Sequence, residues 1–347
     1  MGSYPVVAAA RDRFVLERRG PRPQHDPWRY QGLVVDDERA DDGSIARVAT
    51  VFLTGRECPW RCVMCDLWQH TTTTDTPSGA IPAQVIAARH ALAAQHDVVT
   101  QMKLYNAGSF FDPHAVPDGD YDSVARSVDG LARVIVESHP ALIGARLDRF
   151  LEALNRQADD VSPAQLEVAM GLETAHPEAL ERLHKRMTVD DYARAADALA
   201  ERRVALRTFL LISPPFVPAD QRDLWLLRSI NVAFSCGASV VSLVPTRSGN
   251  GSMEALATDG DFRPPRLCDI ERSIESAYAA LGETADSDNR LPGNHGRVFA
   301  DLWDLERFAD CPGCLDARRA RLHAMNIEQR VLPRIACAQC GGDTPKP

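Results

Sequence analysis

A group of three cysteines constrains this chain more than any other feature of its sequence. Cys58, Cys62 and Cys65 form a C-x3-C-x2-C triplet directly after an apolar run. Thiolates at this spacing can hold three corners of an iron–sulfur cube. A [4Fe–4S] cluster held only by protein needs four cysteine ligands, and no fourth cysteine lies nearby. The triplet therefore predicts a cluster with one open iron, with an incomplete zinc site and buried structural thiols as the alternatives.

The triplet and its place after a predicted strand resemble the signature of radical S-adenosylmethionine (SAM) enzymes. One departure is Met64, which stands where the family often has an aromatic residue. In that superfamily the open iron chelates the methionine amine and carboxylate of SAM. One electron from the cluster then cleaves SAM to a 5′-deoxyadenosyl radical. The resemblance therefore implies a [4Fe–4S] cluster and SAM as cofactors.

Composition and charge narrow the function classes further. The 347 residues are enough for one large α/β domain with appendages, and 45% apolar and 25% charged residues are typical of a soluble globular protein. A net charge of −9 gives no overall attraction to nucleic acid or to an anionic membrane. The sequence has no apolar run long enough for a membrane span and no signal-peptide pattern. Seven of the nine cysteines have metal-ligand-like spacings, which fit a reducing compartment better than a disulfide framework. Together these features predict a cytoplasmic protein without a membrane partner.

The pattern along the chain predicts strands that alternate with helices. Residues 1–28 are rich in arginine and proline and are predicted to form an irregular or partly ordered arm. Two apolar runs, Tyr30–Val35 and Ala46–Leu53, flank an acidic turn and predict a hairpin. Further strands are predicted at Met102–Asn106, Val134–Glu137, Leu166–Leu172, Leu206–Ile212 and Val240–Val244, and helices at 81–96, 141–154, 177–186, 190–202 and 224–234.

This alternation predicts an α/β fold whose parallel strands are joined by right-handed crossovers. Six such units would form a partial (β/α)6 barrel, similar to the core of radical SAM enzymes, in place of the eight units of a closed barrel. We expect an N-terminal arm and hairpin strand over 1–45, the radical SAM core over 46–250, and an extension with a small metal-binding lobe over 251–347. Ligands of parallel α/β folds gather at the carboxyl ends of the strands, and this rule selects the residues considered next.

The first candidate residues at a strand end lie in the segment after the second core strand. Asn106, Ala107 and Gly108 occupy the position of the family's Gly-Gly-Glu-like segment. The resemblance implies that their backbone hydrogen-bonds the methionine amine of SAM, and small residues let a backbone approach a ligand closely. The alternative is an ordinary loop between a strand and a helix.

Two charged residues follow the fourth core strand. Glu173 resembles the polar residue with which the coproporphyrinogen-dehydrogenase and elongator-like branches bind the SAM ribose. Lys185, within His184–Thr188, stands where the elongator branch has an arginine, and the resemblance implies that it pairs with the SAM carboxylate. The alternative for Lys185 and Arg186 is the solvated end of a helix, where cations are favoured.

The last strand ends supply predicted contacts to adenine and substrate. The resemblance implies an apolar contact from Val244 to adenine. Arg247 and Asn250 lie in the polar loop after that strand, and we predict that they contact the substrate. Asp301 lies in a further extended segment, Arg297–Asp304, and is the third substrate candidate. Turn and capping roles are the alternatives for these three residues.

Four cysteines near the end of the sequence form a second metal-ligand pattern. Cys311 and Cys314 make one C-x2-C pair, and Cys337 and Cys340 make another. Such tetrathiolate spacing is a strong metal signal, and we favour zinc over an auxiliary iron–sulfur cluster. Closed four-sulfur zinc sites stabilise small lobes that lack a core of their own. Between the pairs, a predicted basic patch, or alternatively a solvated helix face, consists of Arg318, Arg319, Arg321 and His323.

Four segments resemble a narrower group, the archaeosine-synthase radical SAM subunit and its bacterial relatives within the elongator-like branch. They are Cys58–Trp68, Lys103–Phe110, Gly171–Thr174 and Lys185–Thr188. The leading hypothesis is an enzyme whose 5′-deoxyadenosyl radical abstracts hydrogen from a nucleoside-like or other small polar substrate, in a lyase, rearrangement or oxidoreductase reaction. An electron donor of the flavodoxin or reductase type is the implied partner. The alternatives are a radical SAM enzyme that modifies a tRNA base and a non-catalytic iron–sulfur electron-transfer or interaction protein.

Overall fold

One sheet of eight strands organises the computed structural model, which describes residues 4–106, 108–157, 163–285 and 296–340. The strands lie side by side in chain order, from β1 to β8. β1 and β2 are antiparallel, and every later pair is parallel. The strands are β1 (Gly32–Arg39), β2 (Ile45–Leu53), β3 (Gln101–Asn106), β4 (Arg133–Glu137), β5 (Gln165–Glu173), β6 (Ala205–Ile212), β7 (Ala238–Pro245) and β8 (Arg297–Ala300).

The predicted α/β partial barrel is confirmed, because the six predicted core strands are β2 to β7. The sheet also gains a seventh parallel strand, since β8 pairs with β7 from Val240↔Arg297 to Leu243↔Ala300. The segment predicted at Arg297–Asp304 is thus a strand over its first four residues. Through β8, the C-terminal extension joins the same sheet as the core.

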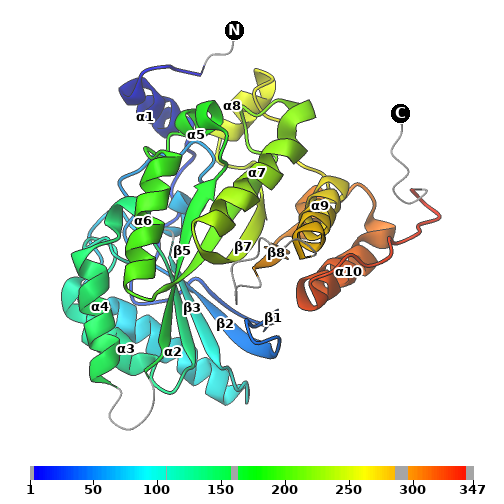
Figure 1. The fold of residues 1–347 in the computed structure, drawn as a ribbon. Coiled ribbons are helices and arrows are strands. Elements are labelled where there is room, and N and C mark those ends of the chain that lie inside the picture. Colours follow the sequence, from blue (N-terminus) through cyan, green and yellow to red (C-terminus); the bar gives the residue numbers. More distant parts are fainter. Residues whose placement is uncertain (1–3, 107, 158–162, 286–295, 341–347) are drawn as a thin grey trace.

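Helices cover the outer side of this sheet (Figure 1). The predicted helices correspond to α2, α4, α5, α6 and α7, and neighbouring helices contact one another, as α2 does α3 and α7 does α9. None of the described helices is both long and apolar enough to cross a membrane. The helices are α1 (Ala8–Glu17), α2 (Ala80–Ala94), α3 (Tyr121–Ser127), α4 (Ala145–Arg156), α5 (Pro177–Arg182), α6 (Val189–Glu201), α7 (Arg222–Ser235), α8 (Ser252–Thr258), α9 (Leu267–Ala285) and α10 (Leu315–Glu328).

The main core lies between the outer face of the sheet and these helices. Val51, Leu104, Val136 and Leu243 are fully buried on four of the strands, and they pack with apolar residues of the helices. Full burial of a side chain of this size stabilises the fold by about 1.5–3 kcal/mol. Because helices cover the parallel strands, the strands read as nearly continuous apolar runs in the sequence.

The inner face of the sheet carries charges near the N-terminal ends of the parallel strands. Arg207 of β6 donates from Nε to Glu167 of β5 (2.6 Å) and from Nη2 to Glu38 of β1 (3.0 Å). Burial alone would raise the pKa of Glu38, but Arg207 and Lys103 outweigh it and lower the pKa to about 2. β1 continues to Arg39 and includes acidic residues that were predicted to form a turn. The ion pairs balance the charge of Glu38 within the strand. The predicted hairpin is right, but its first strand is longer than the predicted run Tyr30–Val35.

The N-terminal arm is more ordered than predicted, because residues 8–17 form the helix α1. This stretch lacks proline, and its Phe14 and Val15 are buried in a second apolar cluster. Pro5 precedes the helix, the other prolines of the arm follow it, and residues 18–28 are irregular. Figure 1 shows α1, α5 and α8 together at one end of the molecule.

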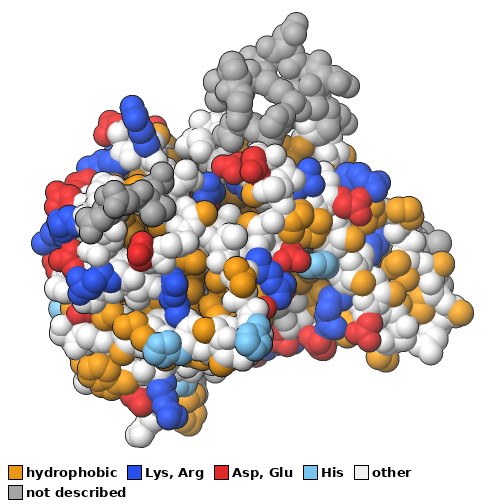
Figure 2. All heavy atoms as spheres, turned by 90° about the horizontal axis from the view of Figure 1, so that it is seen from below, with side chains coloured by type: hydrophobic (Ala, Val, Ile, Leu, Met, Phe, Trp, Pro, Cys, Tyr) orange, Lys and Arg blue, Asp and Glu red, His pale blue; other side chains and the backbone are white. Residues whose placement is uncertain are grey.

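The opposite end has a mixed surface. Figure 2 shows basic and acidic side chains interspersed with apolar ones on the face seen from below. The mixture of charges on this face is consistent with the sequence, in which 48 acidic residues outnumber 39 lysines and arginines. The loop with Cys58, Cys62 and Cys65 lies at the end with α1, α5 and α8, since it bonds to Leu183 just after α5 and to Asn250 just before α8.

Candidate active site at the carboxyl ends of the strands

Cys58, Cys62 and Cys65 lie in the loop after β2, at the carboxyl ends of the parallel strands. Burial raises the pKa of all three thiols, that of Cys62 to about 12. The protein alone therefore keeps them as neutral thiols, and thiolates here need a positive partner such as iron. The three are not among the described groups whose ligand atoms all lie within 4.8 Å of one another. A single zinc ion needs ligand atoms that are grouped in this way, whereas a cluster in which each cysteine binds its own iron does not.

Two other parts of the chain hold the cysteine loop in place. The backbone N–H of Val63 donates to the carbonyl of Leu183 at 3.0 Å, which ties the loop to the end of α5. The side-chain NH2 of Asn250 donates to the carbonyls of Val63 (2.8 Å) and Cys65 (3.2 Å). Asn250 is buried, and its carbonyl accepts from Met253. Its amide is therefore engaged within the protein, in a positioning contact rather than the predicted contact with substrate.

Asn106 is the clearest sign of a ligand at this end of the sheet. Its side chain is 2% exposed at the end of β3, yet neither its amide nitrogen nor its oxygen has a hydrogen-bond partner. A buried amide without partners costs free energy unless a ligand or water satisfies it. Gly108 lies close by, and a Cβ there would stand 2.7 Å from the carbonyl oxygen of Arg56, so only glycine fits. Ala107, which the sequence also selects, lies outside the described residues.

Glu173 and Lys185 form a buried ion pair, with the lysine Nζ 2.5 Å from Glu173 Oε1. Burial alone would lower the pKa of Lys185, but Glu173 and the nearby Cys62 outweigh it and raise the pKa. Lys185 is thus not at a solvated helix end, because α5 ends at Arg182. The pair fills the space over Gly171, where a Cβ would stand 2.1 Å from Glu173 Oε1 and 2.3 Å from Lys185 Nζ.

The backbone of Glu173 is strained in a way that is common at functional sites. Its φ is 67°, in the left-handed region that favours glycine. The register between β5 and β6 also shifts between Gly171 and Glu173. Such a bulge re-aims a side chain, and here it accompanies the turn of the glutamate toward Lys185.

Glu137, at the end of β4, is a site residue that sequence reasoning missed. It is partly buried, and burial raises its pKa to about 8, against the opposing effects of the Asn106 backbone and Lys185. The signal was available, because Glu137 ends an apolar strand predicted to stop at the same edge as the cysteine loop. A carboxyl group kept partly neutral beside an unpartnered amide can accept or donate a hydrogen bond to a ligand.

The raised pKa of Glu137 predicts a pH dependence of stability. Between pH 4.5 and about 8 the folded, cofactor-free protein holds a proton that the unfolded chain has released, so its free energy of unfolding should fall as pH rises. Glu137→Gln should remove this slope and stabilise the protein at pH 8, by at most about 5 kcal/mol. Urea denaturation at both ends of the range measures the effect, with Glu178→Gln, an exposed carboxylate on α5, as the control. Equal slopes in the wild type and Glu137→Gln would contradict the assignment.

Two of the predicted substrate residues lie together where β7 and β8 end. Arg247 Nη2 donates to Asp301 Oδ2 at 2.7 Å and to the carbonyl of Trp303 at 3.0 Å, while the buried Nε of Arg247 has no partner. The ring of Trp303 is 56% exposed and contacts Phe52, with ring centroids 5.5 Å apart. This corner therefore offers an aromatic face and an unused N–H donor. Val244, predicted to contact adenine, is partly buried against the second apolar cluster.

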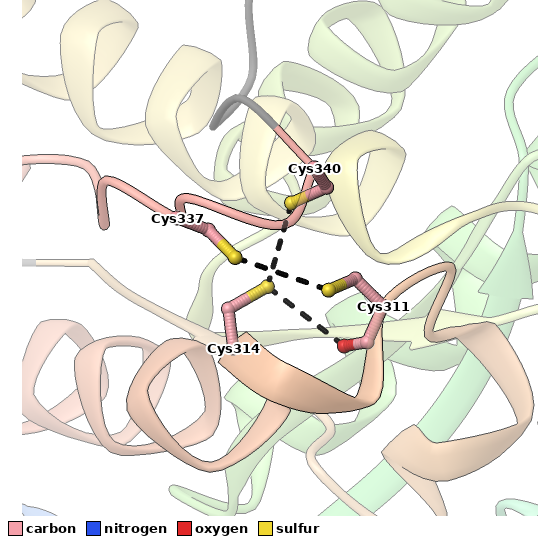
Figure 3. Close-up of side chains that lie close together, drawn as sticks. All are labelled: Cys311, Cys314, Cys337 and Cys340. Atoms are coloured by element: carbon pink, nitrogen blue, oxygen red, sulfur yellow. Dashed lines mark hydrogen bonds between the residues drawn. The ribbon is translucent and has the colours of Figure 1, made fainter.

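The C-terminal cysteines form a metal-ligand group. Ligand atoms of Cys311, Cys314, Cys337 and Cys340 all lie within 4.8 Å of one another. Figure 3 shows the four side chains converging from two segments, with Sγ pairs at 3.9 Å (Cys311 and Cys337) and 3.8 Å (Cys314 and Cys340). A tetrahedral ion with metal–sulfur bonds of about 2.3 Å separates its sulfurs by roughly 3.8 Å. The group therefore has the geometry of a site for one ion.

The thiols of this group differ in acidity. Backbone N–H groups of Cys340 and Gln339 lower the pKa of Cys337 to about 7, whereas burial and the neighbouring thiols raise the pKa of Cys314 to about 12. Backbone donors aimed at sulfur favour the thiolate that a metal binds.

The arginines between the cysteine pairs do not form the predicted basic patch. Arg318 and Arg321 are buried and both pair with Glu271, at 2.5 and 3.1 Å. Arg319 pairs with Asp316 at 3.0 Å. Glu271 comes from α9, so its position was not visible in the local sequence, whereas Asp316 lies three residues before Arg319 on α10 itself. Arg318 and Arg321 attach α10 to α9 and are not available to phosphate.

Comparisons with known proteins agree with this geometry. No family model matches the chain. An archaeosine synthase subunit beta from Methanosarcina acetivorans is 25% identical over 298 residues, which cover 82% of this chain and 80% of that protein. An uncharacterized protein of Methanocaldococcus jannaschii is 24% identical over 269 residues, which cover 74% and 70%. The structure of Elp3 from Methanocaldococcus infernus matches with a TM-score of 0.52 at 13% identity over 83% of this chain, which spans 64% of the Elp3 chain.

The chain resembles the archaeosine-synthase and elongator-like branch of the radical SAM superfamily. The described residues fit the two cofactors of a radical SAM site. The three thiols, an unpartnered buried amide at Asn106 and a partly neutral carboxyl at Glu137 lie at the carboxyl edge of the sheet. At Gly108 the backbone packs so closely against Arg56 that no side chain fits.

Proposed function

We propose that this chain is a radical SAM enzyme that acts on a nucleoside-like or other small polar substrate. The observation that carries the proposal is Asn106, whose buried, unpartnered amide lies at the strand edge that also holds Cys58, Cys62 and Cys65. When bound, the cluster and SAM supply a 5′-deoxyadenosyl radical that abstracts hydrogen from the substrate. The protein contributes positioning, charge balance and exclusion of water.

Each residue at this edge has a task in the proposal. Cys58, Cys62 and Cys65 bind three irons as thiolates and leave the fourth iron to SAM. Glu137 and the Asn106 segment meet the amine of SAM, because a carboxyl group and an amide oxygen can accept its N–H groups. The Lys185 ammonium remains the predicted partner of the SAM carboxylate, with Glu173 fixing its position. Val244 gives the apolar contact for adenine.

The substrate side of the proposal lies at the ends of β7 and β8. Arg247 keeps an N–H donor free and is held by Asp301, so it can bind a carbonyl or another acceptor of the substrate. Trp303 presents an exposed face for a flat ring. These features favour a substrate with a heteroaromatic ring and a polar edge.

The direct test is anaerobic incubation of the reconstituted protein with SAM and dithionite. We expect SAM to change the spectrum of the cluster and 5′-deoxyadenosine to form. Retention of a cluster whose spectrum SAM leaves unchanged would instead support a non-catalytic iron–sulfur protein. Failure to assemble any cluster would refute both readings.

A variant of the Lys185 pair gives a more specific test. Lys185→Met should weaken SAM binding at least about tenfold, because it removes a charge-assisted contact and leaves Glu173 buried without a partner. The double variant Glu173→Gln/Lys185→Met should regain most of the lost stability but not SAM affinity. Equilibrium binding of SAM to the reconstituted variants, beside thermal unfolding, separates these effects. Recovery of affinity in the double variant would show that Lys185 only supports the fold.

A second candidate function places the substrate in tRNA. It is favoured by the relatives named archaeosine synthase subunit beta, and the word subunit implies that a partner protein assembles with them. Against it stand the net charge of −9 and the buried pairing of Arg318 and Arg321. Salt-sensitive tRNA binding, with any required partner subunit added, would support this function. No binding at low salt would exclude it.

For the C-terminal group, we propose zinc. The described sulfurs have the spacing of one tetrahedral ion, while a cluster would place each cysteine on a different iron. Metal analysis of protein purified without iron supplementation should give about one zinc per chain. An auxiliary cluster would instead add iron beyond that held by the first three cysteines.

A further inference from the structure

The segment that precedes the sheet, residues 4–28, contacts the cysteine loop more extensively than its sequence suggested. We call this segment the arm. Its contacts converge on Glu57, the residue before the first cysteine of the triplet, whose side chain is 11% exposed. Arg19 Nη2 lies 2.8 Å from one Glu57 oxygen, and Arg22 pairs with the other. Two arginines of the arm thus share one carboxylate at the entrance to the loop.

Glu57 transmits this contact to the cysteines through Arg61. Arg61 Nη1 lies 3.3 Å from Glu57 Oε1 and donates to the carbonyls of Cys58 (2.7 Å) and Trp60 (2.9 Å). The carboxylate therefore orients the guanidinium that holds the backbone of the first cysteine. Both Glu57 oxygens pair with arginines, so its effect on the cysteines is exerted through Arg61.

Arg22 also holds the far end of the cysteine loop. Its Nη1 donates to the carbonyl of Trp68 at 2.7 Å and to the hydroxyl of Thr71. Arg19 and Arg22 lie over the Trp68 ring, 4.8 and 5.4 Å from its centroid. His25 adds a contact of 2.6 Å to the carbonyl of Gln69. The arm thus bridges the residue before the triplet and the residues after it.

The arm itself is fixed to the body of the protein. Tyr4 donates to the carbonyl of Arg182 at 2.6 Å, and Arg11 pairs with Glu181 at 2.8 Å, both on α5. Phe14 packs in the second apolar cluster. The carbonyl of Arg18 lies 2.0 Å from where a Cβ of Gly251 would be, so the arm also touches the start of α8 closely. The helix α1, through its buried residues Arg11, Phe14 and Val15, thus anchors the two arginines that reach the loop.

We propose that Arg22 and Glu57 are positioning residues that keep Cys58, Cys62 and Cys65 arranged for the cluster. The proposal rests on the proposed function, because it assumes that these cysteines bind iron. Buried charged hydrogen bonds of this kind are worth more than exposed ones, and removing one partner leaves the other without compensation. The arm therefore acts as a clamp on the cysteine loop.

The experiment compares full-length Arg22→Met and Glu57→Gln with the wild type, and with Arg29→Met as a control. Arg29 lies just beyond the arm, and its side chain is 85% exposed. We expect both test variants to lose reconstituted cluster to a chelator on the order of tenfold faster, and the control to match the wild type. Arg22→Lys, which keeps a cation but not the planar fork, should recover part of the retention.

A second readout does not depend on the cluster. In the cofactor-free protein, alkylation mapped by mass spectrometry should be faster at Cys58, Cys62 and Cys65 in both test variants, and unchanged at Cys236 and Cys268. Equal acceleration at all cysteines would mean general unfolding and would overturn the positioning role. Unchanged alkylation and retention in the variants would overturn it as well. A wild type that assembles no cluster would refute the proposed function, while the alkylation comparison would still decide whether the arm holds the loop.

Discussion

Cys62→Ala is expected to reduce 5′-deoxyadenosine formation from SAM by more than about a hundredfold, to the background of the cofactor mixture. Cys62 is the middle cysteine of the triplet, and its thiol has a pKa raised to about 12 by burial. A bound iron would stabilise the thiolate in such surroundings. With two cysteines left, the loop holds too few corners of the cluster to leave one iron open and still retain the rest.

The measurement is anaerobic turnover with SAM and dithionite, beside iron and sulfide content. Cys236→Ala is the matched control, because Cys236 is also a partly buried thiol but lies at the end of α7. The control should keep the full cluster and activity. Formation of 5′-deoxyadenosine by Cys62→Ala at more than a tenth of the wild-type rate would contradict the role of the triplet.

Cys314→Ser is expected to cost the C-terminal site its metal and to release the segment around Cys337 and Cys340. Structural zinc in small peptides contributes about 10–16 kcal/mol of apparent binding free energy, so its loss should outweigh any other contact of this segment. α10 should stay folded, because Leu322 and Met325 are buried in the main core. The effect should therefore be local and large, not global.

Limited proteolysis and metal analysis of the full-length protein test this expectation. In Cys314→Ser, cleavage should concentrate between residues 330 and 340, while the helical signal changes little. Cys268→Ser is the control, since it changes a cysteine outside the four-sulfur group. Full metal content in Cys314→Ser, or collapse of the whole fold, would show that this lobe is built differently from our account.

The strands of the core were predictable because they are short and mostly apolar, as parallel strands covered by helices are. Each of the six predicted core strands overlaps an observed one. The length of β1 was not predictable. Its acidic stretch Asp36–Arg39 has the composition of a turn, and the ion pairs of Glu38 with Arg207 and Lys103 come from strands that are distant in the sequence. α1 was missed because the prolines that follow it dominate the local pattern.

The site shows the same division between local and long-range information. The cysteine motifs are local, so their spacing alone predicted both groups, and the structure brings the four C-terminal cysteines together. Glu137 gives no motif, and its raised pKa depends on a buried position that only the assembled sheet creates. The arginines of α10 looked like a patch for phosphate, but Glu271 on another helix binds two of them. Charge in a sequence therefore predicts a binding surface only when its partners are known.

The pairing of β8 with β7 divides the proposed tasks along the chain. Apart from Val244 of β7, the residues proposed for the cluster and SAM lie on β2 to β5 and the segments after them, whereas Arg247 and Asp301 meet across the last two strands. In evolutionary terms, the two tasks can change at different rates. Substitutions in the last strand and its flanking loops can alter which molecule is accepted while the half proposed to generate the radical stays fixed. With such a division, proteins that share this fold could come to accept different substrates while keeping the same reaction chemistry.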